Sequence, residues 1–204
     1  MQACYRIQRS LDRGDKPKKY RGPFRLIDED TGLVAASCDL VGNAAFATVT
    51  IRDGENRHWQ MRPNRKVMPS RWIVTDPQQR VAMQFDQKIL AKLVNPLYRT
   101  VLVLLTEDDS EAFRLVDPVA NIADRMFGAK IGDWAVLSGD KLVAKLTRLK
   151  RAGEPAGGLL GKVRHWLQSS DFAIVSASEE HALSAPVALS MYLIFRELND
   201  PSGG

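Results

Sequence analysis

The chain is poor in the residues that build metal, disulfide and catalytic sites. It has two cysteines, Cys4 and Cys38, and three histidines, His58, His165 and His181. The cysteines form no CxxC pair, and their wide separation matches neither a disulfide framework nor a zinc knuckle. The histidines lack metal-ligand spacing, and no Ser, Cys, His and acid arrangement indicates a nucleophilic site. We therefore expect no metal, no cofactor and no enzymatic activity.

Long hydrophobic runs are also missing. The longest apolar stretches, 101–105 and 182–195, fall short of the ~20 residues that a membrane-spanning helix needs. Residues 1–11 carry charge without an apolar core, so they do not resemble a signal peptide. Together with the small number of cysteines, these absences predict a cytoplasmic protein that has no transmembrane span but is able to lie peripherally at a membrane.

What the chain does contain is enough apolar sequence for one sizeable core. Of its 204 residues, 45% are hydrophobic and 26% are charged, which fits one large β domain. We expect a single domain over residues 1–200, followed by a flexible tail over 201–204. The 29 Lys and Arg against 24 Asp and Glu give a net charge of +5, which favours anionic partners.

One sequence pattern occurs four times. It consists of an aromatic residue, three mostly apolar residues, Asp or Ser, a short turn and an apolar pair, and it begins at Phe24, Trp72, Phe113 and Trp134. Aromatic and β-branched residues on both sides of such turns are typical of β-hairpins. Further strands are predicted over 5–8, 46–52, 58–62, 100–106 and 172–176, with a turn at Asp53-Gly54. The total is about a dozen strands, and segment 88–97 is left unassigned.

The segment 185–198 predicts a helix instead. Ser184 is suited to the N-cap, and Pro186 falls within the first turn. The segment is apolar on every face, which is typical of a helix enclosed on all sides. Side chains alone fill a barrel of about eight strands, so a wider barrel needs something more inside it. The sequence therefore predicts a mainly β fold, a closed barrel of about twelve strands in sequential hairpins, enclosing a hydrophobic C-terminal helix.

In their order, these elements resemble the tubby C-terminal-like superfamily, particularly its LURP-one-related and phospholipid-scramblase-like branches. The resemblance covers nearly the whole chain and rests on four hairpins and the closing helix, over 24–34, 72–81, 113–122, 134–143 and 186–198. It implies a twelve-stranded barrel threaded by the helix. Tubby proteins bind phosphoinositides, and scramblases are associated with lipid movement.

Two features of the scramblase branch are absent from the chain. It has no cysteine-rich palmitoylation cluster, and Ser176-Ala-Ser-Glu-Glu180 stands where an Asp-rich calcium loop would precede the final helix. Calcium-driven scrambling is therefore not expected. No phosphoinositide-site motif matches residue by residue, so no binding residues are transferred from the family.

Clusters of basic residues are the leading functional candidates. One lies within 1–21, and the others provide candidate ligands for an anionic headgroup: Arg57, Arg62, Arg65, Lys66, Arg71, Lys150, Arg151, Lys162 and Arg164. If these clusters share one end of the barrel, each charge adds roughly 1 kcal/mol at an acidic membrane surface. The alternative is that they are solvated strand edges and loops, where Lys and Arg discourage edge pairing. Asp28, Asp76 and Asp117 occupy equivalent turn positions and are interpreted as structural.

The leading hypothesis is therefore a non-enzymatic module that docks on anionic phospholipid or phosphoinositide headgroups through a basic surface. The alternative is a protein–protein interaction or scaffold domain of unknown partner, which an exposed apolar patch away from the basic surface would favour. Nucleic-acid binding is not expected, because the sequence contains no recognised motif for it.

Overall fold

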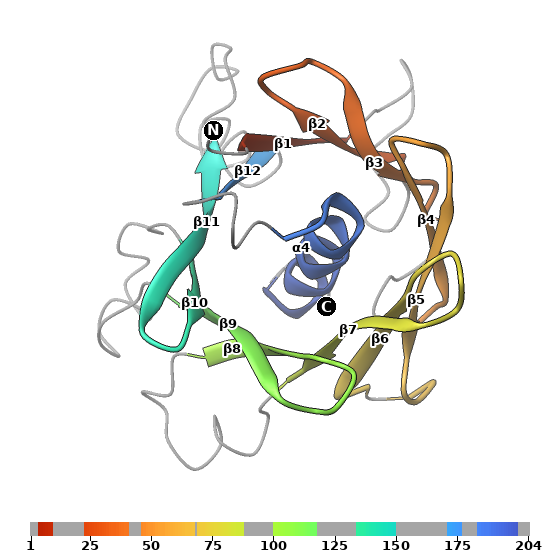
Figure 1. Ribbon diagram of the computed structural model, residues 1–204, viewed down its shortest axis with the longest axis vertical. Coiled ribbons are helices and arrows are strands. Elements are labelled where there is room, and N and C mark those ends of the chain that lie inside the picture. The colour runs from red at the N-terminus through yellow and green to blue at the C-terminus, as the bar shows by residue number, and fades with distance from the viewer. Residues whose placement is uncertain are drawn as a thin grey trace, which may run out of the picture.

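The computed structural model describes residues 4–9, 23–40, 46–67, 69–87, 100–117, 134–149, 171–176 and 183–199. Within these ranges the chain forms twelve strands and one helix (Figure 1). The strands are β1 (Cys4–Arg9), β2 (Phe24–Asp28), β3 (Val34–Cys38), β4 (Val49–Asp53), β5 (His58–Pro63), β6 (Arg71–Thr75), β7 (Val81–Asp86), β8 (Thr100–Leu105), β9 (Glu111–Val116), β10 (Trp134–Ser138), β11 (Lys141–Leu149) and β12 (Asp171–Ser176). The helix is α4 (Ala185–Asn199).

Each strand pairs antiparallel with its neighbours in sequence, as strands joined by hairpins do. The first strand also pairs with the last: Tyr5 lies opposite Asp28 of β2 on one side and opposite Ile174 of β12 on the other. The strand order thus runs around a closed barrel. The predictions of a mainly β domain, of sequential hairpins and of a C-terminal helix are confirmed.

Helix α4 lies at the centre of the ring of strands (Figure 1). Ser184 precedes it, and its carbonyl accepts a 2.9 Å hydrogen bond from the Ala188 N–H, as expected of an N-cap residue. Leu189 and Met191 are fully buried. The hydroxyl of buried Ser190 donates to the Pro186 carbonyl at 2.8 Å, so the helix accommodates a polar residue inside the core. No helix in the described part of the chain is long and apolar enough to cross a membrane.

The strands alternate between an inward apolar face and an outward face, as their two-residue period requires. On β2, for example, Phe24 and Leu26 are fully buried while Arg25 between them is exposed. The Phe24 ring meets Tyr192 edge-on at 6.3 Å between centroids, and the Trp134 ring meets Phe195 in the same way at 4.7 Å. These contacts hold the C-terminal half of α4 against the first residues of β2 and β10.

Because the strands run alternately up and down, their connections fall at two ends of the barrel. The hairpin end carries the short turns 29–33, 54–57, 76–80, 106–110 and 139–140. The opposite end, here called the loop end, carries 39–48 and 64–70, of which 41–45 and 68 lie outside the described residues. Phe24 and Trp134 begin their strands at the loop end, so α4 runs from the hairpin end towards the loop end.

The structure corrects two details of the predicted elements. The strand predicted over 46–52 begins only at Val49 and ends at Asp53. A hairpin between β8 and β9, turning through 106–110, was not anticipated. The second half of the hairpin predicted at Phe113, the whole of the unassigned segment 88–97 and the tail 201–204 lie outside the described residues.

Candidate functional site

Three turns at the hairpin end share one backbone geometry. In 53–57, 76–80 and 106–110, the first residue donates its N–H to the carbonyl of the fifth and accepts a bond from the N–H of the fourth. The fourth residue has a left-handed backbone, with φ of 62° at Asn56, 64° at Gln79 and 61° at Asp109. This pattern is typical of a three-residue hairpin loop whose twist matches that of the flanking strands. The hairpin end is thus made of repeated structural turns.

Two of these turns are clamped by an aspartate and the arginine four residues later. Asp53 Oδ1 accepts the Arg57 N–H at 2.9 Å, and Oδ2 accepts Arg57 Nε at 2.8 Å. Asp76 binds Arg80 in the same way, with both distances 2.9 Å. Arg57 also lies 3.1 Å from Glu55. Arg57, predicted as a headgroup ligand, is therefore engaged by carboxylates of its own turn. The structural interpretation of Asp28 and Asp76 is confirmed, since Asp28 Oδ1 likewise accepts backbone N–H groups of its turn.

The Asp53 clamp predicts a defined response to acid. Burial of the carboxylate opposes its ionisation, but hydrogen bonds from the Trp59 indole and from Arg57 outweigh this effect and lower the pKa of Asp53. A lowered folded-state pKa gives stability that is fully present above the unfolded-state pKa and is lost as pH falls through the folded-state pKa. We expect the free energy of unfolding to fall below pH ~4, and Asp53→Asn to flatten that fall. Urea unfolding at a series of pH values measures this; parallel curves for the two proteins would contradict it.

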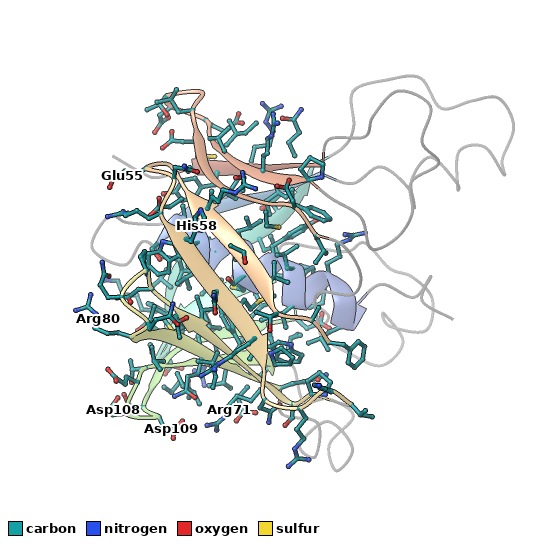
Figure 2. All side chains as sticks on the ribbon, turned by 90° about the vertical axis from the view of Figure 1, so that its right-hand side faces the viewer. Glu55, His58, Arg71, Arg80, Asp108 and Asp109 are labelled. Atoms are coloured by element: carbon teal, nitrogen blue, oxygen red, sulfur yellow. The ribbon has the colours of Figure 1, made fainter. Side chains whose placement is uncertain are left out.

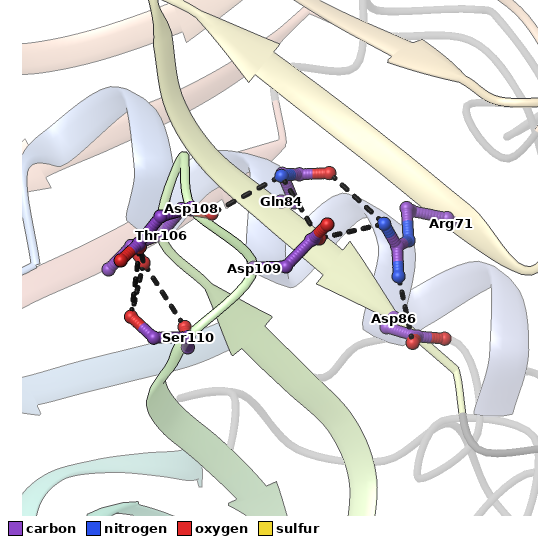
Figure 3. Close-up of polar contacts among 7 residues, drawn as sticks. All are labelled: Arg71, Gln84, Asp86, Thr106, Asp108, Asp109 and Ser110. Atoms are coloured by element: carbon purple, nitrogen blue, oxygen red, sulfur yellow. Dashed lines mark hydrogen bonds and ion pairs between the residues drawn. The ribbon is translucent and has the colours of Figure 1, made fainter.

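Arg71, another predicted ligand, belongs to a network on the outer face of the barrel (Figure 3). Its guanidinium donates to Asp109 at 2.9 Å and lies 3.5 Å from Asp86. Gln84, which is buried, donates to the same Asp109 carboxylate at 3.3 Å and to the Thr106 carbonyl at 3.2 Å. The network joins β6 and β7 to the turn between β8 and β9. The charge of Arg71 is thus balanced by two carboxylates.

In the loop between β5 and β6, the described cations are exposed and have no carboxylate partner among the described residues. The base of this loop is closed by Asn64, whose Oδ1 accepts the backbone N–H groups of Ser70 at 3.3 Å and Arg71 at 3.2 Å. Pro69 is buried and anchors the returning chain. Between these fixed points, residues 65–67 are exposed, and Val67 has 75% of its surface accessible. We call Arg65, Lys66 and Val67 the cationic tip.

Arg62 lies on the same side of the molecule as the tip. It is exposed, five residues along β5 from Arg57, and it pairs in register with Ile73 of β6. In the described part of the chain, Arg62, Arg65 and Lys66 have no carboxylate partner. Of the predicted ligands, these three are brought to the loop end with their charge unbalanced.

The structure also separates residues that the sequence placed in one cluster. Arg57 and Arg65 lie at opposite ends of β5, roughly 20 Å apart for a six-residue strand. Figure 2 shows Arg80, Glu55 and Asp108 along the side of the hairpin turns, away from the C-terminal end of α4. The remaining predicted ligands lie outside the described residues: Lys150, Arg151, Lys162 and Arg164.

Several large apolar side chains are exposed, a feature that the sequence alone does not reveal. Val67 and Phe46, which is 47% exposed, both belong to connections at the loop end. Leu33 and Val34 are exposed at the hairpin end, beside the acidic turn that begins at Asp28. Among the described residues, an exposed apolar side chain therefore adjoins unbalanced cations in sequence at the cationic tip.

Across the described ranges, no group of three or more His, Cys, Asp or Glu side chains is placed to hold a metal ion. Cys38 is buried, and this burial raises the pKa of its thiol to about 12. At neutral pH that thiol is protonated and chemically inert.

Comparison with known proteins bears on the fold. No family model matches the chain, and no curated protein matches it in sequence. The structure is similar to the X-ray structure of a protein from Arabidopsis thaliana, with a TM-score of 0.53 and 12% sequence identity. The match covers 97% of this chain and 91% of that one. At this level of identity the similarity concerns the architecture and carries no activity from one protein to the other.

Proposed function

We propose that this protein is a non-enzymatic binding module that docks on anionic phospholipid headgroups, phosphoinositides among them, through Arg62 and the cationic tip. The observation that carries the proposal is that three exposed cations without carboxylate partners among the described residues gather at one end of the barrel. Arg57 and Arg71 are left out of this smaller site because aspartates already engage them.

We also propose membership of the tubby C-terminal-like superfamily. The support is a barrel of sequential hairpins around an apolar C-terminal helix, the arrangement that the sequence resemblance implied. A peripheral position at a cytoplasmic membrane surface follows from the two proposals taken together.

The expected affinity is modest and depends on salt. Each cation near an acidic membrane contributes roughly 1 kcal/mol, so three supply about 3 kcal/mol, which falls short of the ~4 kcal/mol of a millimolar complex. A membrane raises the overall affinity because it presents many headgroups at once. Because the cations are exposed, added salt screens them over a Debye length of ~8 Å at physiological ionic strength.

Co-sedimentation of the full chain with vesicles tests the proposal. We expect the protein to pellet with vesicles of phosphatidylcholine and phosphatidylserine, more so when a phosphoinositide is included, and to remain in solution with phosphatidylcholine alone. Raising the salt concentration should release it. Equal recovery with charged and uncharged vesicles, or no recovery with either, would rule out the proposed function.

A protein-interaction domain is the second candidate. Leu33 and Val34 are adjacent, and 69% and 40% of their surfaces are exposed at the hairpin end, away from the cationic tip. Adjacent exposed apolar residues are the kind of feature that partner proteins cover. The pair is small compared with a stable interface of about 800 Å² per partner, so headgroup binding remains the function that we favour.

A further inference from the structure

The cationic tip combines two properties that a membrane surface recognises together. Arg65 and Lys66 match the charge of anionic headgroups, and Val67, the next residue, exposes three quarters of its apolar surface. Just beneath the headgroups a bilayer offers an apolar boundary, where a neighbouring hydrophobic side chain is buried. A soluble anion offers the charge without that boundary. The arrangement therefore fits a lipid surface better than a free inositol phosphate.

The base of the loop that carries the tip is held by hydrogen bonds before any ligand arrives. Besides the bonds to its side chain, Asn64 donates its own N–H to the Arg71 carbonyl at 2.8 Å. The Ser70 carbonyl accepts the Gln87 N–H at 2.8 Å, which ties the loop to the end of β7. Little conformational entropy is then lost when the tip meets a surface, because its base is already ordered.

The charges of the barrel favour one orientation at the membrane. Three exposed carboxylates at the described hairpin end have no arginine or lysine partner among the described residues: Asp30, Glu107 and Asp108. The other exposed carboxylates in these turns are paired with arginines: Glu29, Glu55, Asp109 and Asp140. The three unpaired carboxylates repel an anionic surface, which favours an approach by the loop end. Phe46 is also exposed at the loop end, three residues before Val49, which pairs with Met61 of β5. A second apolar side chain is therefore exposed at the loop end.

We infer that the docking is oriented and partly apolar: the loop end faces an anionic bilayer, and Val67 enters the boundary between headgroups and acyl chains. This inference rests on the proposed function and names its physical partner, a bilayer surface. Leu33 is its natural control, since 69% of its surface is exposed at the opposite end of the same barrel.

An environment-sensitive fluorophore at position 67 tests the inference. In a Cys4→Ser background, Val67→Cys is labelled with a nitrobenzoxadiazole dye, and Leu33→Cys is labelled in parallel; Cys38 is buried and is not expected to react. With phosphatidylcholine and phosphatidylserine vesicles, we expect the emission at position 67 to shift to the blue and grow stronger. The label at position 33 should keep the spectrum that it has in water. Inositol trisphosphate should shift neither label.

A second pair of variants measures the apolar contribution directly. We expect Val67→Ser to lower vesicle partitioning about tenfold, because the buried valine surface is lost while the charge of the tip is unchanged. Leu33→Ser should change partitioning less than about twofold, because Leu33 lies at the end of the barrel that faces away from the membrane. If the chain still pellets with anionic vesicles while the label at position 67 stays water-like, the inference fails and the proposed function stands. If it does not pellet at all, both fail.

Discussion

With Arg65 and Lys66 both replaced by glutamate, the protein is expected to stop pelleting with anionic vesicles. The double change moves the tip from two positive to two negative charges, a difference of four units at the point of closest approach. At roughly 1 kcal/mol per charge, the binding free energy falls by about 4 kcal/mol, which is roughly a thousandfold in affinity. Fold stability should be nearly unchanged, because in the described part of the chain neither side chain has an ion-pair partner.

The matched control is the same change at Lys141 and Lys145 of β11. Both lysines are exposed and have no carboxylate partner within the described ranges, and Lys141 begins β11 at the hairpin end. Replacing them with glutamate alters the net charge equally but leaves the tip intact. We expect only a small loss of binding, from long-range attraction that salt screens. Equal losses in the two double variants would mean that net charge, and not the tip, governs binding.

The hairpins and the helix were predictable because their signals are local. Each strand carries its own two-residue alternation, and the Asp-centred turns contain their own hydrogen-bond acceptors. The helix was expected over 185–198 and is found over Ala185–Asn199, since its cap and its apolar composition both lie within the segment. No contact between residues that are distant in sequence is needed to identify elements of this kind.

The positions of the predicted basic ligands in the fold, and their ion-pair partners, could not be predicted from the sequence. Arg71 meets Asp86 and Asp109, which lie 15 and 38 residues away along the chain, and only the register of β6 to β9 brings them together. Arg57 and Arg65 are close in sequence, yet β5 carries them to opposite ends of the barrel. Grouping the basic residues by their proximity in sequence therefore gave a larger candidate site than the structure assembles.

One missed signal was present in the sequence. Asp53 and Arg57 repeat the spacing of Asp76 and Arg80; Asp53 is the last residue of β4, and Asp76 directly follows β6. An acid followed four residues later by an arginine, at two successive hairpins, indicates a turn clamp more than a ligand site. Recognising the repeat would have removed Arg57 from the candidates before the structure was known.

Truncating the centre of the helix is expected to cause the largest loss of stability. Leu189 is fully buried in α4, and a closed ring of hydrogen-bonded strands surrounds it. Because the pairing of the strands fixes the radius of the ring, the wall cannot move inward to fill a cavity. We therefore expect Leu189→Ala to cost about 3–5 kcal/mol, the upper part of the range for buried leucines. The midpoint of urea unfolding, followed by far-ultraviolet circular dichroism, measures the loss.

Leu33→Ala is the control, since it removes the same atoms from an exposed site and should change stability by less than about 0.5 kcal/mol. A cost below about 1 kcal/mol for Leu189→Ala would mean that the interior collapses around the deletion, contrary to a rigid wall. With a total stability of about 5–15 kcal/mol, the variant still has a folded population. That population should bind anionic vesicles as the parent does, because the cationic tip stands on a loop closed by Asn64 outside the core. Binding that survives a core deletion but not a charge reversal would place the proposed function in the tip and the stability in the helix.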